Sequence, residues 1–273
     1  MAVNTQKYTI QNIDAVTGYD LEDGSLLFRA EDLHSGEMTN EQETVYATGK
    51  GGVRISASDR NKASRFTAEN GTIVEGILAA QVGTDVATET EAVIPDYYDV
   101  IAVAGAEGSA TAVTTYTAVG ETGAEIAFIY KKNADGTAGE KYPIAAAASE
   151  TEFAYDPDTK TLSLPTKGLK AGDEIVAVYD FKVATAKHIQ NREDKYSKTV
   201  RAVFDIFCQD ICTNKSYLGK IIYPKGKVSG NFNLAFGDEF AVQNLEIEAM
   251  SGGCSGAANV LWDFYIYDDA DAV

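Results

Sequence analysis

The chain has 273 residues, of which 45% are hydrophobic and 23% charged, a composition typical of a globular protein able to bury a sizeable core. Its formal net charge of −18 argues against a surface that grips nucleic acid, because such surfaces use Lys and Arg to neutralise phosphates. The start of the chain, MAVNTQKYTI, lacks the basic and apolar regions of a signal peptide, and no apolar run approaches the ~18 residues of a membrane-spanning helix. We therefore expect a soluble protein made in the cytoplasm.

The first third of the chain predicts strands around a glycine-rich turn. Only glycine supplies the φ freedom of Gly49–Gly52 cheaply, and the strand that follows alternates Val53, Ile55 and Ala57 against polar residues. The predicted segments are an arm or irregular first strand over 1–20, a strand over Gly24–Ala30, a polar loop or short helix over Glu31–Gln42, and strands over Thr44–Ala47 and Val53–Ser58.

A short amphipathic helix is predicted after the polar residues Asp59–Lys62. Thr72 and Glu75 have the T-x-x-E spacing of a capping box, in which each side chain can accept a hydrogen bond from the other residue's backbone N–H. Gly83 stands where a C′ glycine belongs. The helix needs a sheet to cover its apolar stripe, which consists of Ile73, Val74, Ile77, Leu78, Ala80 and Val82.

The middle third differs in composition from the rest of the chain and is rich in Ala, Thr and Gly. Thr84–Pro95 is interpreted as a connector, and the turns NADG and DPDT predict hairpins, with Tyr155 and Leu162 on either side of the second. We interpret 95–172 as a small β subdomain, either inserted or extending the main sheet, and 1–94 with 173–273 as the core. The predicted strands are Asp99–Val103, Ala110–Ala118, Ile126–Lys131, Glu152–Tyr155 and Thr161–Leu164.

The last third contains long strands in which apolar and polar residues alternate cleanly. This period of two indicates sheets with one buried and one polar face, so the fold class is mainly β. The predicted strands are Asp173–Val183, Thr199–Ile211, Val228–Phe236, Gln243–Met250 and Asn259–Tyr267.

Residues capable of catalysis or metal binding are sparse. His34 and His188 lie far apart in polar stretches, and no nucleophile motif such as G-x-S-x-G accompanies them. Cys208, Cys212 and Cys254 lack the spacing of a zinc site and are read as free, buried thiols. The sequence therefore predicts no catalytic residue, metal or cofactor, and the protein is not expected to be an enzyme.

Several motifs resemble the major tail tube proteins of long-tailed bacteriophages. The family's T-V-Y-A-x-G turn and R-x-x-x-x-D-x-N-K motif match Thr44–Gly49 and Arg54–Lys62. The segments KTVRAVFDIFCQDICTN and YPKGKVSGNFNLAF are similar in style to the family's C-terminal half. The resemblance covers roughly two thirds of the chain and leaves 95–172 without an assigned role.

The resemblance implies a tail-tube-type β-sandwich with one flanking helix. Six copies would close a ring whose inner sheets form one barrel, and stacked rings would form a tube through which DNA passes without specific binding. The implied partners are other copies of the chain and the tape measure, tail terminator and baseplate or tip proteins. The implied location is the virion tail, assembled in the host cytoplasm and not associated with membranes. Both contractile and non-contractile tails are compatible.

The polar strand faces supply hypotheses about the assembled tube. Asp205, Glu246 and Glu248 are candidates for lining the channel, where like charge would let DNA slide; outer solvent is the alternative for each. Residues 1–20 and Glu31–Glu43 are candidates for ring-to-ring contact, with Tyr8, Ile10 and Leu33 as contact residues. The alternative function is a virion-surface decoration or carbohydrate-binding β module whose active part is the middle subdomain.

Overall fold

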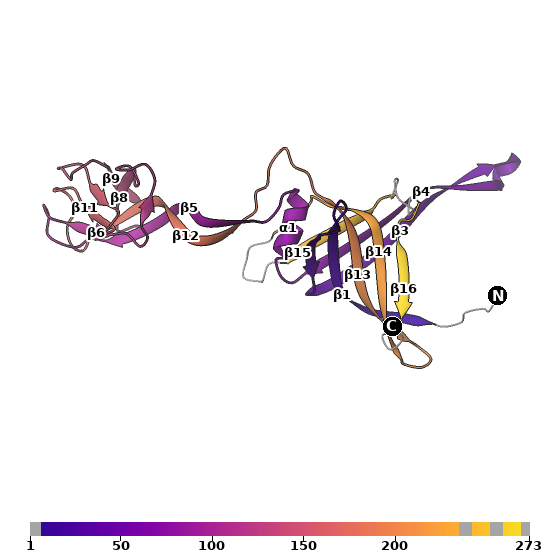
Figure 1. The fold of residues 1–273 in the computed structure, drawn as a ribbon. Helices are drawn as coiled ribbons and strands as arrows, with labels where there is room; N and C mark the ends of the chain where they lie inside the picture. The colour runs from indigo at the N-terminus through magenta and orange to yellow at the C-terminus, as the bar shows by residue number, and fades with distance from the viewer. Residues whose placement is uncertain (1–6, 235–241, 252–258, 269–273) are drawn as a thin grey trace. The chain divides into compact units, whose positions relative to one another are not determined.

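The computed structural model describes residues 7–234, 242–251 and 259–268, which fold into mainly β structure with a single α-helix among them. The sandwich-like, mainly β fold class is confirmed. The chain divides into two compact units. Unit 1 comprises Met1–Ala87 and Ile189–Val273, and unit 2 comprises Thr88–His188 (Figure 1).

Unit 1 contains one antiparallel sheet with the order β2-β1-β13-β14-β15-β4-β3, in which β16 also pairs with β14. β14 bonds β16 through Leu218–Ile222 and β15 through Gly226–Val228, so two strands share one of its edges. The strands are β1 (Tyr8–Asp20), β2 (Leu26–Ala30), β3 (Leu33–Thr48), β4 (Arg54–Asn70), β13 (Thr199–Asp210), β14 (Ser216–Val228), β15 (Gln243–Ala249) and β16 (Asp263–Tyr267).

One face of this sheet buries the core of unit 1. Phe204 and Tyr223 pack edge to face at 5.0 Å between ring centroids, and Phe66 lies 4.2 Å from Phe204. The helix α1 (Glu75–Val82) adds Ile77 and Ala80 to the same cluster. The alternation expected in β13 and β15 is therefore present, because their apolar positions face this cluster.

The predicted N-terminal cap of α1 is wrong by two residues. The helix begins at Glu75, and its N-cap is Val74, so Thr72 and Glu75 do not occupy the N-cap and N3 positions of a capping box. The Thr72 hydroxyl donates instead to Asp32 Oδ2 at 3.1 Å, and the Gln243 side chain accepts from Val74 N at 2.8 Å. The predicted C-terminal glycine is confirmed: Gly83 has φ +78° and donates to Ala79 O.

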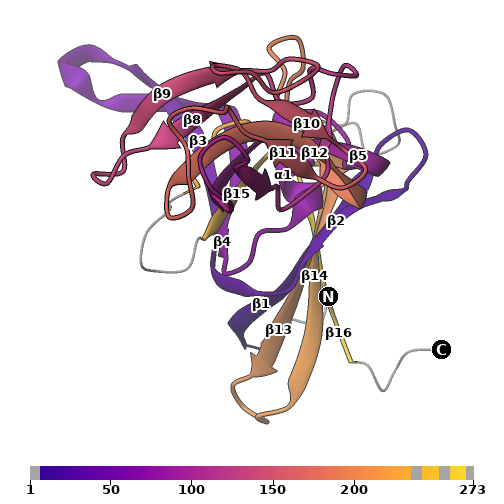
Figure 2. The same cartoon turned by 90° about the vertical axis from the view of Figure 1, so that its left-hand side faces the viewer.

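The long hairpin formed by β3 and β4 differs most from the sequence-based prediction. Glu31–Gln42 is neither a loop nor a helix, since β3 begins at Leu33, and Asp59–Lys62 is not a break, since β4 runs through it. A 3-10 turn, Lys50–Gly52, joins the strands. We call Asn40–Ala63 the hairpin arm; none of its residues is buried, and it extends beyond the other strands of unit 1 (Figure 1, Figure 2).

Two further predicted segments have other structures. Thr84–Pro95 is not a connector but contains the beginning of a 16-residue strand, β5. The prediction of a strand over Val228–Phe236 is wrong: β14 ends at Val228, and residues 229–234 form no strand. Residues 235 and 236 lie outside the described part of the chain. Residues 1–20 contain β1, whose two register shifts against β13 make it an irregular first strand.

Unit 2 contains two sheets, β5-β12-β8-β9, with β7 also paired to β12, and β10-β11-β6. The DPDT hairpin is confirmed, since Tyr155 pairs with Leu162, and the NADG turn joins β8 to β9. The strands are β5 (Ala87–Ala102), β6 (Thr111–Val113), β7 (Ala118–Val119), β8 (Phe128–Lys132), β9 (Ala138–Pro143), β10 (Ala154–Asp156), β11 (Thr161–Ser163) and β12 (Glu174–His188).

Unit 2 has a core of its own, with Ile129, Phe153 and Leu162 fully buried. Asp99, only 4% exposed, accepts hydrogen bonds from the Tyr179 hydroxyl at 2.6 Å and from the backbone and side chain of Thr115 at 2.8 and 3.0 Å. Burial, and then the bond to Asp99, raises the pKa of Tyr179. The unit extends beyond the predicted 95–172 on both sides, because β5 and β12 pair as long strands.

Candidate assembly surfaces

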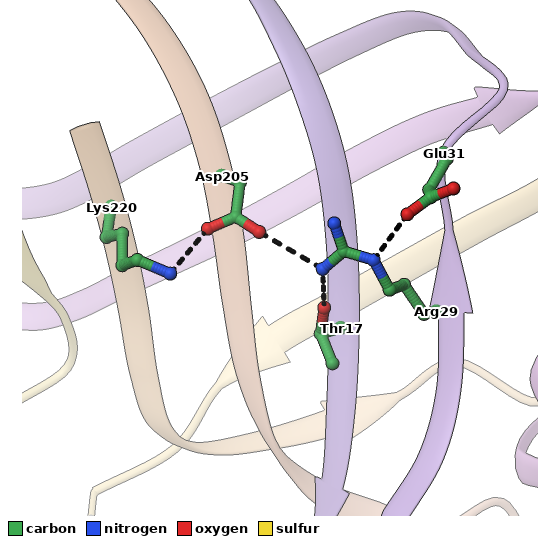
Figure 3. Close-up of polar contacts among 5 residues, drawn as sticks. All are labelled: Thr17, Arg29, Glu31, Asp205 and Lys220. Carbon is green, nitrogen blue, oxygen red and sulfur yellow. Dashed lines mark hydrogen bonds and ion pairs between the residues drawn. The ribbon is translucent and has the colours of Figure 1, made fainter. Parts of the chain in front are cut away.

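Asp205, one of the predicted channel-lining acids, lies in a network of ion pairs on the face of the sheet opposite the core (Figure 3). Arg29 Nη1 lies 3.2 Å from Asp205 Oδ2 and donates to Thr17 Oγ1 at 2.9 Å, while Lys220 Nζ lies 2.8 Å from Asp205 Oδ1. Arg29 Nε also contacts Glu31 Oε1 at 2.6 Å. We call these five residues the Asp205 cluster.

Strand register brings the members of this cluster together. Thr17 pairs with Arg29 across β1 and β2, and Asp205 pairs with Lys220 across β13 and β14. The hydrogen bond to Asp205 raises the pKa of Lys220, and Glu31, followed by Asp205, raises that of Arg29. Two cations balance two carboxylates, so Asp205 contributes no unbalanced negative charge to this face.

Glu246 and Glu248 occupy a more acidic part of the sheet. Both alternate with buried Leu245 and Ile247 on β15 and therefore lie on the face away from the core. Arg65 Nη1 lies 3.5 Å from Glu246 Oε1, whereas Glu248 has no ion pair within the described residues. Glu246 also lines an open groove of about 390 Å³ whose other lining residues include Glu37, Glu69, Ser35, Thr67 and Asn244.

The three predicted ring-contact residues have different environments. Leu33 packs against the core of unit 1, so its side chain already has apolar partners within the chain. Tyr8 packs edge-on against Tyr217, with ring centroids 5.4 Å apart. Ile10 is 57% exposed and is the most available of the three for contact with another molecule.

The sequence analysis predicted the outer part of the hairpin arm, the strands Thr44–Ala47 and Val53–Ser58 with the glycine-rich turn between them, but not the continuation of these strands through Gln42 and Asp59–Lys62. The strands of the arm pair from Glu41–Ala63 out to Thr48–Arg54, and the Arg54 guanidinium lies 3.9 Å above the Tyr46 ring. Val53 and Ile55, near the tip, are 63% and 69% exposed. The alternation of Val53, Ile55 and Ala57 and the Gly49–Gly52 turn indicated the strands near the tip. Their continuation is polar and has no buried face, so hydrophobic periodicity could not reveal it.

The sheet of unit 1 also has unpaired edges within the described residues. The strand order ends at β2 on one side and at β3 on the other, and β3 contains no buried residue. An edge strand presents N–H and C=O groups that can bond a strand of another chain. Its three glutamates, Glu37, Glu41 and Glu43, oppose unselective pairing, since charges on an edge strand discourage aggregation.

The histidines and the two described cysteines form no catalytic arrangement. His188 Nδ1 lies 3.0 Å from Glu89 Oε1, and His34 packs closely against Gly71. Cys208 is buried, which raises its pKa, and Cys212 is exposed; Cys254 lies outside the described residues. In the described ranges, no group of three or more His, Cys, Asp or Glu side chains could hold a metal ion.

Over the part of the chain that the structure describes, these features define a mainly β protein with a single α-helix, an exposed arm and open sheet edges. The family model described as the YomU/Tube protein family matches residues 8–260, so the chain belongs to that family. No curated protein matches the chain. Family membership points to a phage tube-like structural protein and a component of the virion. None of the helical structure described is long and apolar enough to cross a membrane.

Proposed function

We propose that this protein is the major tail tube subunit of a long-tailed phage and that it self-assembles into stacked hexameric rings through which DNA passes. The observation that carries the proposal is the hairpin arm, a two-stranded extension without a buried residue. The open edges of β2 and β3 support it.

The hairpin arm needs a partner for physical reasons. An isolated two-stranded hairpin is marginally stable in water, and exposed Val53, Ile55 and Tyr46 gain nothing from folding until another surface covers them. Between Thr44 and Ser58 the only charged residues are Lys50 and Arg54, although the whole chain has a net charge of −18. This basic, partly apolar tip of the arm is complementary to another copy of an acidic chain.

The open edges favour a closed ring. A sheet closed into a barrel has no free edges, so β2 or β3 of one copy could complete the sheet of the next. A head-to-tail contact of this kind makes a ring if the rotation closes, and an arm directed to the next ring makes a filament. The tape measure, tail terminator and baseplate or tip proteins would then meet the tube at its bore and two ends.

The acidic side of the sheet is our candidate for the channel lining. Asp205 is balanced by Arg29 and Lys220, whereas among the described residues Glu248 has no ion pair and Glu246 has one partner, Arg65, at 3.5 Å. We therefore assign the repulsion of DNA chiefly to Glu246 and Glu248, which together with Glu37 and Glu69 outnumber the neighbouring cations Arg65 and Lys227. Phage carrying Glu246→Lys with Glu248→Lys should form tubes but deliver DNA slowly; normal infectivity would contradict the assignment.

Assembly can be tested on the purified chain with one substitution in the arm. Ile55→Asp replaces an apolar side chain that is 69% exposed in the single chain with a charged one. Val113→Asp, the control, makes the same kind of change at a 56% exposed site in unit 2. We expect negative-stain images of rings or tubes for the unaltered chain and for Val113→Asp, and loss of tubes for Ile55→Asp. Tubes that survive Ile55→Asp would refute the role of the arm. A stable monomer or trimer of the unaltered chain would favour the decoration module.

A further inference from the structure

A hollow in unit 1, separate from the open groove beside β15, combines apolar side chains with carboxylates. It has a volume of about 300 Å³, and its lining residues belong to β1, β13, β14 and β16. Phe207, Leu218 and Tyr267 supply apolar surface. Asp14 and Asp205 supply the carboxylates, and among the described residues no Lys or Arg lines the hollow. We call this hollow the Asp14 pocket.

Asp14 gives the pocket a negative charge that no described cation neutralises. It occupies the bulge of β1 between Ile13 and Ala15, and it has neither an ion pair nor a hydrogen bond among the described residues. The other carboxylate belongs to the Asp205 cluster, in which two cations balance two carboxylates. Four further charged side chains on or beside this face also cancel: Lys215 with its ion-pair partner Asp268, and Arg201 with Asp263. The pocket therefore carries one unbalanced negative charge.

The tip of the hairpin arm has the complementary chemistry. Val53 and Ile55 are 63% and 69% exposed, and Arg54 lies between them in the sequence. Neither Arg54 nor Lys50 has an ion pair within the described residues, and no Asp or Glu occurs from Thr44 to Ser58. The arm extends beyond the other strands of its own copy (Figure 1), so its tip is presented to other molecules.

Such a tip needs a receptor that offers both a carboxylate and apolar contact. The open groove beside β15 is acidic, but its apolar lining residues, Ala68 and Leu245, are buried and offer little apolar surface. In the Asp14 pocket, Phe207 and Leu218 are partly exposed, and Tyr267 is 36% exposed. The Asp14 pocket therefore fits the tip better than the groove does.

We propose that the arm tip of one copy docks in the Asp14 pocket of another copy. Two chains with a net charge of −18 repel each other, so a contact between the basic tip and an acidic pocket is the favourable one. Arg54 then supplies the cation that Asp14 lacks, while Val53 and Ile55 cover the apolar lining and remove apolar surface of both copies from water. The inference rests on the proposed self-assembly through the arm and deepens it by naming the surface that receives the arm.

Reciprocal charge reversal in the full-length chain tests the contact. Asp14→Lys and Arg54→Glu each bring like charges together, so each should raise the concentration for half-maximal association, measured by sedimentation, by ~10-fold or more. The double variant restores opposite charges and should return to within ~3-fold of the unaltered chain.

Glu22→Lys is the matched control, because it makes the same charge change at an exposed site of unit 1, on the turn after β1. It should change the concentration for half-maximal association by at most ~2-fold and should not rescue Arg54→Glu. An Asp14→Lys variant that associates as Glu22→Lys does would overturn the proposal, as would a double variant no better than Arg54→Glu alone. Circular dichroism checks folding, and Asp14→Asn, with an expected rise of ~3-fold, replaces Asp14→Lys if that variant does not fold.

Negative-stain images of the same samples separate this contact from the proposed tube. Tubes that Ile55→Asp abolishes but Asp14→Lys leaves intact would refute this contact and retain the tube. A small oligomer that is lost in Asp14→Lys, restored by adding Arg54→Glu and never organised into rings or tubes would refute the tube and retain this contact. A chain that stays monomeric at every concentration would refute both.

Discussion

Units 1 and 2 are both antiparallel β structures, but they differ in how much of each is complete within one chain. Unit 2 has two sheets around a core containing fully buried Phe153, and its buried Asp99 is satisfied by Tyr179 and Thr115. Unit 1 has a comparable core but also a hairpin arm without buried residues and two edge strands, β2 and β3, whose outer edges no described strand pairs. The difference teaches that the described strands of unit 2 are largely satisfied within one chain, whereas unit 1 leaves backbone edges and an arm available for contact.

The largest effect on assembly is expected from removing the arm. An Asn-Gly turn in place of Thr44–Asp59 would join Glu43 to Arg60, which already pair across the hairpin. The folded part of unit 1 should change in unfolding free energy by less than ~1 kcal/mol, because the removed residues bury nothing. Electron microscopy should show that tubes are lost.

A matched change in unit 2 provides the control for that deletion. Shortening the Asn133–Gly136 turn to Asn-Gly should leave tubes intact, since this turn belongs to the β8–β9 hairpin of unit 2. If the chain lacking the arm still formed tubes of normal appearance, the arm would not be needed for assembly, and units 1 and 2 would not differ in this respect.

The next largest effect is a loss of stability that should be confined to one unit at a time, because each unit has its own core. Phe204→Ala in unit 1 and Phe153→Ala in unit 2 each truncate a buried ring and should cost ~3–5 kcal/mol in the unit concerned. The single tryptophan, Trp262, belongs to unit 1, so its fluorescence follows that unit while circular dichroism follows both. Phe153→Ala should leave the fluorescence transition in urea unchanged. If it shifts that transition as much as Phe204→Ala does, the units unfold as one.

A smaller loss of stability is expected at the buried carboxylate of unit 2. Asp99→Ala leaves the Tyr179 hydroxyl and two donors of Thr115 without their acceptor, which should cost ~2–3 kcal/mol. Exposed Asp158→Ala, the control, should stay within ~0.5 kcal/mol. Equal urea midpoints for the two variants would show that the Asp99 network does not stabilise unit 2.

The smallest effect concerns the Asp205 cluster. Lys220 is 40% exposed, so Lys220→Met should cost no more than ~1 kcal/mol. Because folding raises the pKa of Lys220, its contribution is fully present below the ordinary lysine pKa of ~10.4 and is lost as the pH rises through the folded value. Urea midpoints measured between pH 8 and about 12 should therefore keep a constant difference up to about pH 10 and converge only at higher pH. A difference in urea midpoint that stayed constant over the whole pH range would show that the ion pair between Lys220 and Asp205 does not contribute to stability.

The sequence predicted most reliably the elements that bury one face. Alternation revealed β13 and β15, and the turn residues between Tyr155 and Leu162 revealed their hairpin. The tip of the arm was predicted from the alternation beside the Gly49–Gly52 turn, but its continuation was missed because the polar residues there have no apolar period. The capping box was wrong because the helix begins at Glu75, and the Thr72 hydroxyl donates to Asp32. Asp205 could be placed on a polar face, but its neutralisation depends on Arg29 and Lys220, which only strand register brings close.

A three-dimensional reconstruction of the assembled chain by electron cryo-microscopy tests the central claim most directly, that neighbouring copies complete unit 1. We predict stacked six-membered rings in which Val53 and Ile55 of the hairpin arm are covered by another copy. Isolated chains, or an assembly in which the arm stays in solvent and the β2 and β3 edges stay unpaired, would contradict it.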